Sequence, residues 1–171
     1  MRKAVVLVIP LMMLIMSGCS SSVTLVDHPA GSNTALAHVG DTLDLYTLSG
    51  KHFSVQLTKV IDPATAKKAN AGSGRRFVAI VFHITNTSDK QLQANLGADT
   101  LVLSSSGTQY NHDRVALTEC AGSSNEQFTL DAGKSTTLCA AFRLHTSVTV
   151  AQVQFLPTVG AANDYGQWLV P

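Results

Sequence analysis

The chain has 171 residues, of which 45% are hydrophobic and only 13% are charged, and its formal net charge is +1. So much apolar sequence without blocks of like charge excludes a largely disordered chain, and its length suits one domain of about 100–200 residues. A net charge this close to zero also excludes the strongly basic surface that nucleic-acid binding requires.

The first residues have the features of a bacterial signal peptide. Arg2 and Lys3 form a basic start, and residues 4–16 are uncharged but too few to span a membrane, which takes about 20 residues of helix. Small residues then lead to a Met-Ser-Gly-Cys sequence that ends at Cys19 and resembles a bacterial lipobox, with Met16 where leucine is usual. The resemblance implies a diacylglycerol on Cys19, which would hold the protein at the extracytoplasmic face of the cell membrane. The alternative is ordinary secretion, with Cys19 as a spare thiol.

The segment after Cys19 is rich in Ser, Thr, Ala and Gly and shows no sustained period, so we interpret it as a flexible tether. About 20 extended residues reach at most roughly 65–70 Å, which is enough to lift a domain off a membrane. The predicted organisation is therefore a lipoprotein signal peptide at 1–18, a tether at 19–38 and one folded domain at 39–171.

After Gly40, apolar and polar residues alternate, which is the pattern of half-buried β-strands. One such strand covers 51–61, and we expect its inward-facing residues to be Phe53, Val55, Leu57 and Ile61. The segment 77–85 is apolar on one face and mildly apolar on the other, with His83 on the outer face, so it predicts a central strand. Its inward-facing residues are Val78, Ile80, Phe82 and Ile84.

Three further strands are expected in the second half of the domain. Leu101 and Leu103 mark the first of them, and 134–144 forms the second. The inward-facing residues of the second are Leu138, Ala140, Phe142 and Leu144. In 148–156 the apolar face changes near residue 150, which predicts a β-bulge. Six or seven short strands separated by turn residues, with no convincing amphipathic helix, indicate an all-β sandwich or barrel.

Two cysteines remain when the lipobox cysteine is acylated, and these are Cys120 and Cys139. Export places them in an oxidising compartment, where a disulfide is the default interpretation and a metal pair or reactive thiol the alternative. Such a bridge closes a loop of about 20 residues and contributes roughly 3 kcal/mol. Because Leu138 and Ala140 point inward, Cys139 lies on the outer face, and the bridge fastens the loop 117–130 to a sheet surface.

Four segments in a set order resemble one family. They are VGDTLDL at 39–45, RRFVAIVFHITNTSDKQL at 75–92, LVLSSSGTQY at 101–110 and LDAGKSTTLCAAFRL at 130–144. Together they resemble the telokin-like, immunoglobulin-like extracellular domain of bacterial lipoproteins, which is similar to the mycobacterial immunogenic secreted protein family. Alanine stands at position 132 where proline is common, and only some members have the two cysteines. The resemblance implies an immunoglobulin-like antiparallel β-sandwich of about seven strands, and no catalytic residue.

No catalytic motif is found in the rest of the sequence. The Gly-Lys-Ser-Thr sequence at 133–136 imitates the end of a phosphate-binding loop, but Phe128 stands where that loop needs glycine, and a strand follows instead of a helix. No Gly-x-Ser-x-Gly sequence is present. The segment after the signal peptide has two glutamates, Glu119 and Glu126, and no carboxylate pair stands out. We therefore expect a protein that is not an enzyme and has no cofactor.

A metal-handling protein is the alternative function. The histidines share no ligand motif, so any copper or zinc site would have to be assembled by the fold; they stand at 28, 38, 52, 83, 112 and 145. A blue-copper site needs a free cysteine and usually a methionine, and all four methionines lie in the signal peptide. No metal ligand is therefore assigned.

Two groups of residues are candidates for binding. The aromatic residues that could line a binding face are Tyr46, Tyr110, Tyr165 and Trp168. The cations clustered between the strands predicted at 51–61 and 77–85 are Lys67, Lys68, Arg75 and Arg76, and they could face anionic envelope polymers or lipid headgroups. The alternative for the cations is a solvated loop. Our leading hypothesis is a membrane-anchored, non-enzymatic envelope lipoprotein whose partner is an envelope protein, a polymer or a small ligand held between the sheets.

Overall fold

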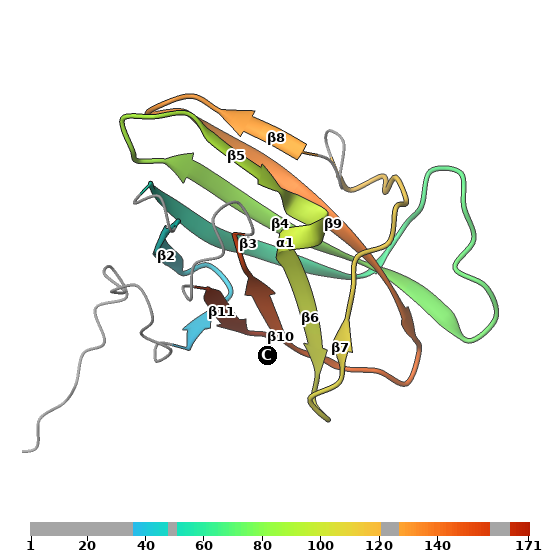
Figure 1. The fold of residues 1–171 in the computed structure, drawn as a ribbon. Helices are drawn as coiled ribbons and strands as arrows, with labels where there is room; N and C mark the ends of the chain where they lie inside the picture. The colour runs from blue at the N-terminus through green and yellow to red at the C-terminus, as the bar shows by residue number, and fades with distance from the viewer. Residues whose placement is uncertain (1–35, 48–50, 121–126, 158–164) are drawn as a thin grey trace, which may run out of the picture.

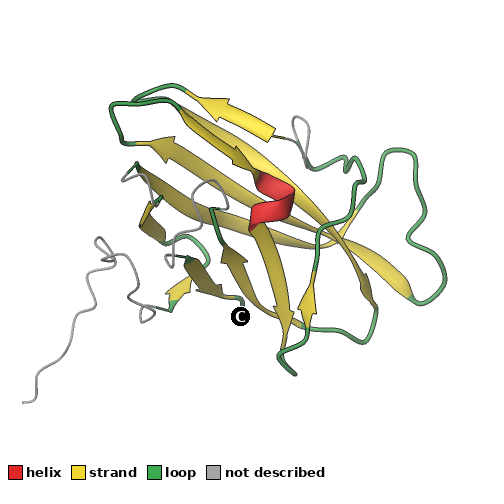
Figure 2. Ribbon diagram, in the orientation of Figure 1, coloured by secondary structure: helices red, strands yellow, loops and turns green. Residues whose placement is uncertain are grey.

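The computed structural model describes residues 36–47, 51–120, 127–157 and 165–171. Within these ranges nearly every regular element is a β-strand, and the strands form two sheets packed face to face with a small two-stranded sheet beside them (Figure 1, Figure 2). The predicted all-β sandwich is therefore confirmed. More strands are present than the seven expected, because several of them are only two to five residues long.

The first sheet has four antiparallel strands. Their order is β2 (Thr42–Tyr46), β3 (His52–Ala64), β4 (Arg75–Asn86) and β9 (Ser135–His145). As predicted, β4 is central, because it pairs with β3 on one side and with β9 on the other. Its register with β9 runs without interruption from Arg75 opposite His145 to Thr85 opposite Ser135. The central strand β4 and the edge strand β9 therefore form one uninterrupted antiparallel ladder.

The second sheet has five strands. Their order is β1 (Ala37–His38), β11 (Gly166–Leu169), β10 (Val150–Phe155), β6 (Thr100–Ser104) and β7 (Gln109–Tyr110). All pairs are antiparallel except β1 with β11, which run parallel, so the sandwich is not purely antiparallel. Ala37 is fully buried, so the folded part already includes residues that the sequence assigned to the tether.

A small sheet and one helical turn complete the described elements. The strands β5 (Leu92–Asn95) and β8 (Gln127–Leu130) pair with each other, and α1 (Leu96–Asp99) follows β5. The Asn95 side chain accepts a hydrogen bond from the backbone N–H of Ala98 at 3.0 Å, which caps the helix. A helix of four residues is too short to leave an amphipathic pattern, so the sequence did not predict it.

The core lies between the two large sheets and is centred on aromatic rings. Phe82 of β4 contacts Phe155 of β10 and Trp168 of β11, with ring centroids 5.4 Å and 5.7 Å apart. Trp168 is fully buried, and its indole Nε1 donates to the carbonyl oxygen of Asp41 at 3.0 Å. The sequence placed Trp168 among the candidates for a binding face, and this is corrected: it is a core residue that joins the two sheets.

Bulges in β3 and β10 decide which residues face inward. In β3 the register shifts between Leu57 and Lys59, so Thr58 is an extra residue, and its hydroxyl donates to the carbonyl oxygen of Val81 at 2.9 Å. Val60 consequently packs on the main core and Ile61 on the opposite face, which corrects the prediction for Ile61. In β10 the register shifts between Val150 and Gln152, which confirms the predicted bulge.

The sequence marked β6 by two leucines without assigning its inward face, and the structure assigns that face to Val102. Val102 is fully buried in the main core, whereas Leu101 and Leu103 are only partly buried and lie on the outer face of the five-stranded sheet. The strand is short, and its flanking residues Thr100 and Ser104 are buried although they are polar. The leucines located the strand correctly, but the side of it that packs on the core is the other one.

Candidate functional site

A segment that follows β7 covers the outer face of the four-stranded sheet, and we call residues 111–120 the strap (Figure 1). Beneath it lies a second apolar cluster, separate from the main core. Its buried members are Ala64, Phe77, Ala79, Val81, Val115, Leu117, Cys120, Cys139 and Ala141. This cover explains why the outer face of β4 is apolar at Ala79 and Val81.

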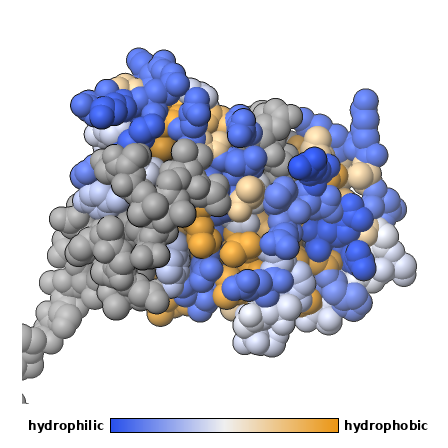
Figure 3. Space-filling view, in the orientation of Figure 1, coloured by the Kyte–Doolittle hydropathy of each residue, from blue (hydrophilic) through white to orange (hydrophobic). Residues whose placement is uncertain are grey.

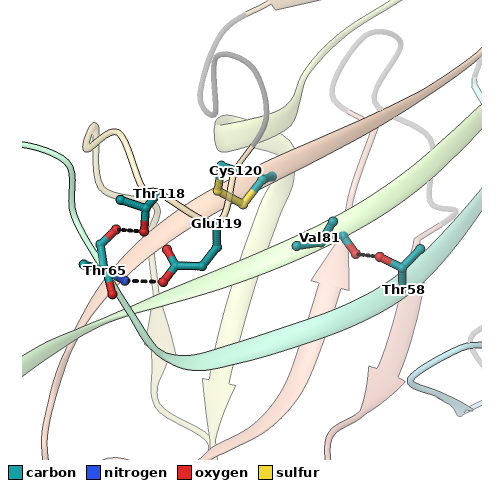
Figure 4. Close-up of a disulfide and its surroundings, with 7 residues drawn as sticks. Thr58, Thr65, Val81, Thr118, Glu119 and Cys120 are labelled. Carbon is teal, nitrogen blue, oxygen red and sulfur yellow. Dashed lines mark hydrogen bonds between the residues drawn. A yellow bond between two sulfur atoms is a disulfide. The ribbon is translucent and has the colours of Figure 1, made fainter.

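Covalent and hydrogen bonds hold the strap in place (Figure 4). A disulfide joins Cys120 to Cys139 of β9, with the Cα atoms 5.5 Å apart, which confirms the predicted bridge and its place on the outer face. The backbone N–H of Thr118 donates to the carbonyl oxygen of Thr65 at 2.7 Å, and Leu117 forms a β-bridge with Ala66. The strap is thus held to β9 by the disulfide and to the segment after β3 by backbone pairing.

Glu119 adds a charged contact to this attachment. One of its carboxylate oxygens accepts a hydrogen bond from the backbone N–H of Thr65 at 2.8 Å. Burial alone would raise the pKa of Glu119, but hydrogen bonds from backbone N–H groups, including its own and that of Thr65, and from the Thr118 and Thr65 hydroxyls together lower it. The carboxylate is therefore ionised at neutral pH and stabilises the junction in that state.

Where the strap meets the loop after β3, the surface has a hollow of about 450 Å³, which we call the cationic hollow. Its lining residues are Lys67, Lys68, Ala69, Arg114, Val115 and Ala116. The three cationic side chains are exposed, and within the part of the chain that the structure describes no hydrogen bond or ion pair engages any of them. No acidic residue lines the hollow. The hollow therefore gathers positive charge over a floor of small apolar side chains.

Arg114 belongs to this group although it is far from the lysines in the sequence. It reaches them because the strap crosses the sheet and pairs with the loop, and the backbone N–H of Lys67 donates to the carbonyl oxygen of Ala116 at 2.9 Å. The sequence grouped cations by their closeness along the chain. No local pattern could have identified Arg114, because its position depends on a pairing between distant segments.

The two arginines of the predicted cluster lie elsewhere. Arg75 is exposed at the start of β4 and does not line the hollow. Arg76 points to the opposite side of the strand, where it pairs with Asp62 through two nitrogen–oxygen contacts. It also donates to the carbonyl oxygens of His145 and Val148, at 2.6 Å and 2.7 Å. The structure therefore brings together only the two lysines of the four predicted cations.

The contacts of Arg76 indicate that this side chain stabilises the fold. The hydrogen bond to Asp62 raises the pKa of Arg76 above its already high value, so the guanidinium stays charged. Arg76 also lines a separate cleft of about 610 Å³ between the two sheets, together with Val60, Val148 and Val150. Since its donors are already engaged by the protein, Arg76 joins the ends of the two sheets and offers little to a ligand.

A second ion pair neutralises another arginine close to the strap. Arg143 of β9 pairs with Asp113 at 2.7 Å, and its guanidinium carbon lies 5.4 Å from the centroid of the Phe77 ring. This arrangement fastens the beginning of the strap to the edge of the sheet. The cations of the hollow stand apart from it because they have no such partner within the described residues.

The histidines are dispersed over the fold. His83 contacts the hydroxyl of Thr137 at 3.1 Å, His145 contacts that of Ser147 at 2.8 Å, and the ring of His52 stacks edge-on with Tyr46. Among the described residues, no three His, Cys, Asp or Glu side chains come together as a metal-binding group. His28, Cys19 and Glu126 lie outside those residues. Nothing in the described part of the fold therefore favours the metal-handling alternative.

The geometry defines a two-sheet β-sandwich with a disulfide-fastened strap across one outer face. In the described part of the chain, no helix has the length and apolar character needed to cross a membrane. No protein-family model matches the sequence, and neither does any curated protein.

Solved structures do match the fold. The yjhA protein of Bacillus subtilis has a TM-score of 0.58 at 12% identity, over 80% of this chain and 100% of that one. The secreted protein MPT63 of Mycobacterium tuberculosis has a TM-score of 0.56 at 12% identity, over 81% of this chain and 99% of that one. The protein ycdA of Bacillus subtilis subsp. subtilis strain 168, classed as a candidate lipoprotein, has a TM-score of 0.54 at 12% identity, over 77% of this chain. This chain spans only 38% of ycdA. At such low identity, these likenesses show a shared fold and nothing finer.

Proposed function

We propose that this protein is a non-enzymatic binding module of the bacterial cell envelope, and that its cationic hollow binds phosphate groups of an anionic envelope polymer. One observation carries the proposal. Three cations from two distant segments, Lys67, Lys68 and Arg114, surround one hollow and have no partner within the described residues. Cations held together without acids repel one another, so an anion that enters the hollow relieves this repulsion.

The chemistry of the three side chains suits phosphate. The guanidinium of Arg114 can donate two parallel hydrogen bonds to one phosphate group, whereas each lysine supplies a compact charge that can follow a flexible polymer. Each cation near a charged envelope surface contributes about 1 kcal/mol. The small side chains of the floor, Ala69 and Ala116, leave room for a bulky phosphodiester.

The disulfide supports a location outside the cytoplasm. Disulfides persist in oxidising compartments, and the Cys120–Cys139 bridge fastens the strap that carries Arg114. The lipobox-like sequence before Cys19 adds the proposal that a lipid holds the chain at a membrane on its extracytoplasmic face. A tether of about 20 residues would then let the hollow reach polymers within roughly 65–70 Å of the membrane.

The test measures binding of poly(glycerol phosphate) to the mature chain carrying Cys19→Ser. We compare the wild-type hollow with the triple variant Lys67→Gln, Lys68→Gln, Arg114→Gln. At about 1 kcal/mol per cation, the triple variant is expected to lose affinity about 100-fold. The matched control is Lys51→Gln, Lys90→Gln, Lys134→Gln, which removes the same charge from the opposite end of the four-stranded sheet and should bind like the wild type.

Two outcomes would overturn the proposal. Equal losses in the triple variant and in its control would show that net charge, and not the hollow, attracts the polymer. Binding to vesicles that contain phosphatidylglycerol, without binding to the polymer, would assign the hollow to lipid headgroups instead.

A further inference from the structure

The five-stranded sheet differs from the rest of the molecule in its charge. None of its five strands contains an Asp, Glu, Lys or Arg residue, and His38 is its only titratable side chain apart from Tyr110. Every strand of the four-stranded sheet, by contrast, contains at least one charged residue. The outer face of the five-stranded sheet is therefore an uncharged surface on an otherwise charged domain.

Two rows of residues cross this outer face, and we call them together the Leu–Gln face. The first row crosses the strands in the order β7, β6, β10, β11 and β1. Its residues, in that order, are Gln109, Leu103, Gln152, Leu169 and His38. The strand register places Leu101, Gln154 and Gln167 side by side in the other row. Leu36, just before β1, continues this second row and is 52% exposed. Figure 3 shows apolar side chains in orange over β6 and β10, with polar ones beside them.

The glutamines form a hydrogen-bonded chain with two open ends. The amide nitrogen of Gln154 donates to the amide oxygen of Gln167 at 3.1 Å, and the amide nitrogen of Gln167 donates to the amide oxygen of Gln152 at 2.9 Å. Within the described residues, the donor of Gln152 and the acceptor of Gln154 are left without a partner. The chain therefore ends in a donor on one side and in an acceptor on the other.

We propose that two copies of this chain pair through the Leu–Gln face about a two-fold axis. A two-fold axis that passes between Gln152 and Gln154 brings the free donor of each copy to the free acceptor of the other, as a self-complementary interface requires. This axis lies in the interface, parallel to the two rows and midway between them, so it lays the second row of one copy on the first row of the other. Leu101 of each copy then meets Leu103 of the other. Because the strands of this face contain no Asp, Glu, Lys or Arg, no acidic or strongly basic side chain in them repels the same face of a second copy.

This pairing is independent of the cationic hollow, which lies on the outer face of the other sheet. Two copies joined in this way would carry one hollow each on the sides that face away from the interface. Because binding at one hollow raises the local concentration of polymer at the other, the pair would hold a long polymer more tightly than one copy does.

The experiment is sedimentation equilibrium of the mature chain carrying Cys19→Ser, so that no lipid drives association. We expect a monomer–dimer equilibrium. Gln152→Lys should raise the dissociation constant at least tenfold, because the axis brings its two lysines close together. The matched control is Gln93→Lys on the exposed face of β5, which makes the same change outside the interface and should leave the equilibrium unaltered.

A mixing experiment tests the axis itself. Gln154→Glu alone should also weaken dimerisation, but an equal mixture with Gln152→Lys should associate again, because residue 152 of one copy faces residue 154 of the other. Thermal melting of each variant shows that it is folded. A monomer throughout the micromolar range would overturn the proposal, as would a dimer that Gln152→Lys leaves intact. Failure of the mixture to associate would overturn the axis.

Discussion

The two large sheets are alike on their inner faces, which are apolar, but differ in the residues on their outer faces. Both direct alternate apolar residues into the shared core, where Phe82 of one sheet meets Phe155 and Trp168 of the other. On the outside, the four-stranded sheet carries charged residues, an apolar cluster and the strap that covers it. The outward-facing strand residues of the five-stranded sheet include leucines and glutamines but no Asp, Glu, Lys or Arg. The comparison shows that the core specifies the sandwich, whereas the outer faces distinguish its two sides.

The largest effect is expected from loss of the disulfide. Replacing both cysteines, Cys120→Ser with Cys139→Ser, should lower the free energy of unfolding by about 3 kcal/mol, because the unfolded chain regains the freedom of a loop of about 20 residues. Urea denaturation measures the loss. Amide hydrogen exchange should accelerate first at 65–67 and 116–118, where the strap pairs with the loop, and not in β10. Uniform acceleration in both sheets would contradict a strap that is stabilised locally.

The next largest effect on stability is expected from loss of the Arg76 side chain. Arg76→Met should cost about 2 kcal/mol, because it removes hydrogen bonds of a charged donor to Asp62 and to two carbonyl oxygens. Arg75→Met is the matched control, since the same side chain one residue earlier is exposed, and it should cost less than about 0.5 kcal/mol. Equal costs in thermal or urea denaturation would mean that Arg76 does not join the ends of the two sheets.

The smallest effect is expected from Glu119, whose contribution to the free energy of unfolding depends on pH. The pKa of Glu119 in the folded protein lies below its ordinary value of 4.5, so its stabilisation is complete above that value and is lost as pH falls through the lower folded value. Glu119→Gln should therefore cost at most about 1 kcal/mol at neutral pH, because the amide oxygen of glutamine can still accept the hydrogen bond from Thr65. The difference between variant and wild type should shrink below pH 4.5. Unfolding at a series of pH values measures it, and a difference that grows in acid would contradict the assignment.

Local patterns predicted much of the fold correctly. The alternation in 77–85 identified a central strand whose inward residues are all buried, because alternation reflects only which side of a strand faces the core. The change of face near residue 150 identified the bulge in β10. The position of Cys139 between two inward residues placed the disulfide on the outer face. Each of these inferences depends on residues that are neighbours along the chain.

Other features depended on contacts between distant segments. The bulge at Thr58 turned Ile61 outward, and nothing in the residues of β3 marks it, because it arises from pairing with β4. The burial of Val102 in place of Leu101 and Leu103 depends on which side of β6 packs against the other sheet. The hydrophobicity of a side chain indicates how favourable its burial would be, but it does not indicate on which side of the strand the other sheet lies.

The candidate site divides in the same way. By itself the sequence determined that cations gather after the strand predicted at 51–61 and that a disulfide-bonded loop follows later, since both can be identified from residue types and their positions along the chain. Only the tertiary structure decided that Arg114 joins Lys67 and Lys68, because the strap must first cross the sheet and pair with the loop. The tertiary structure also decided that Arg76 lies apart from the two lysines. Consecutive residues of a strand point to opposite faces, and Arg76 points to the face where Asp62 accepts its hydrogen bond. Closeness along the chain becomes closeness in space only where the backbone pairing allows it.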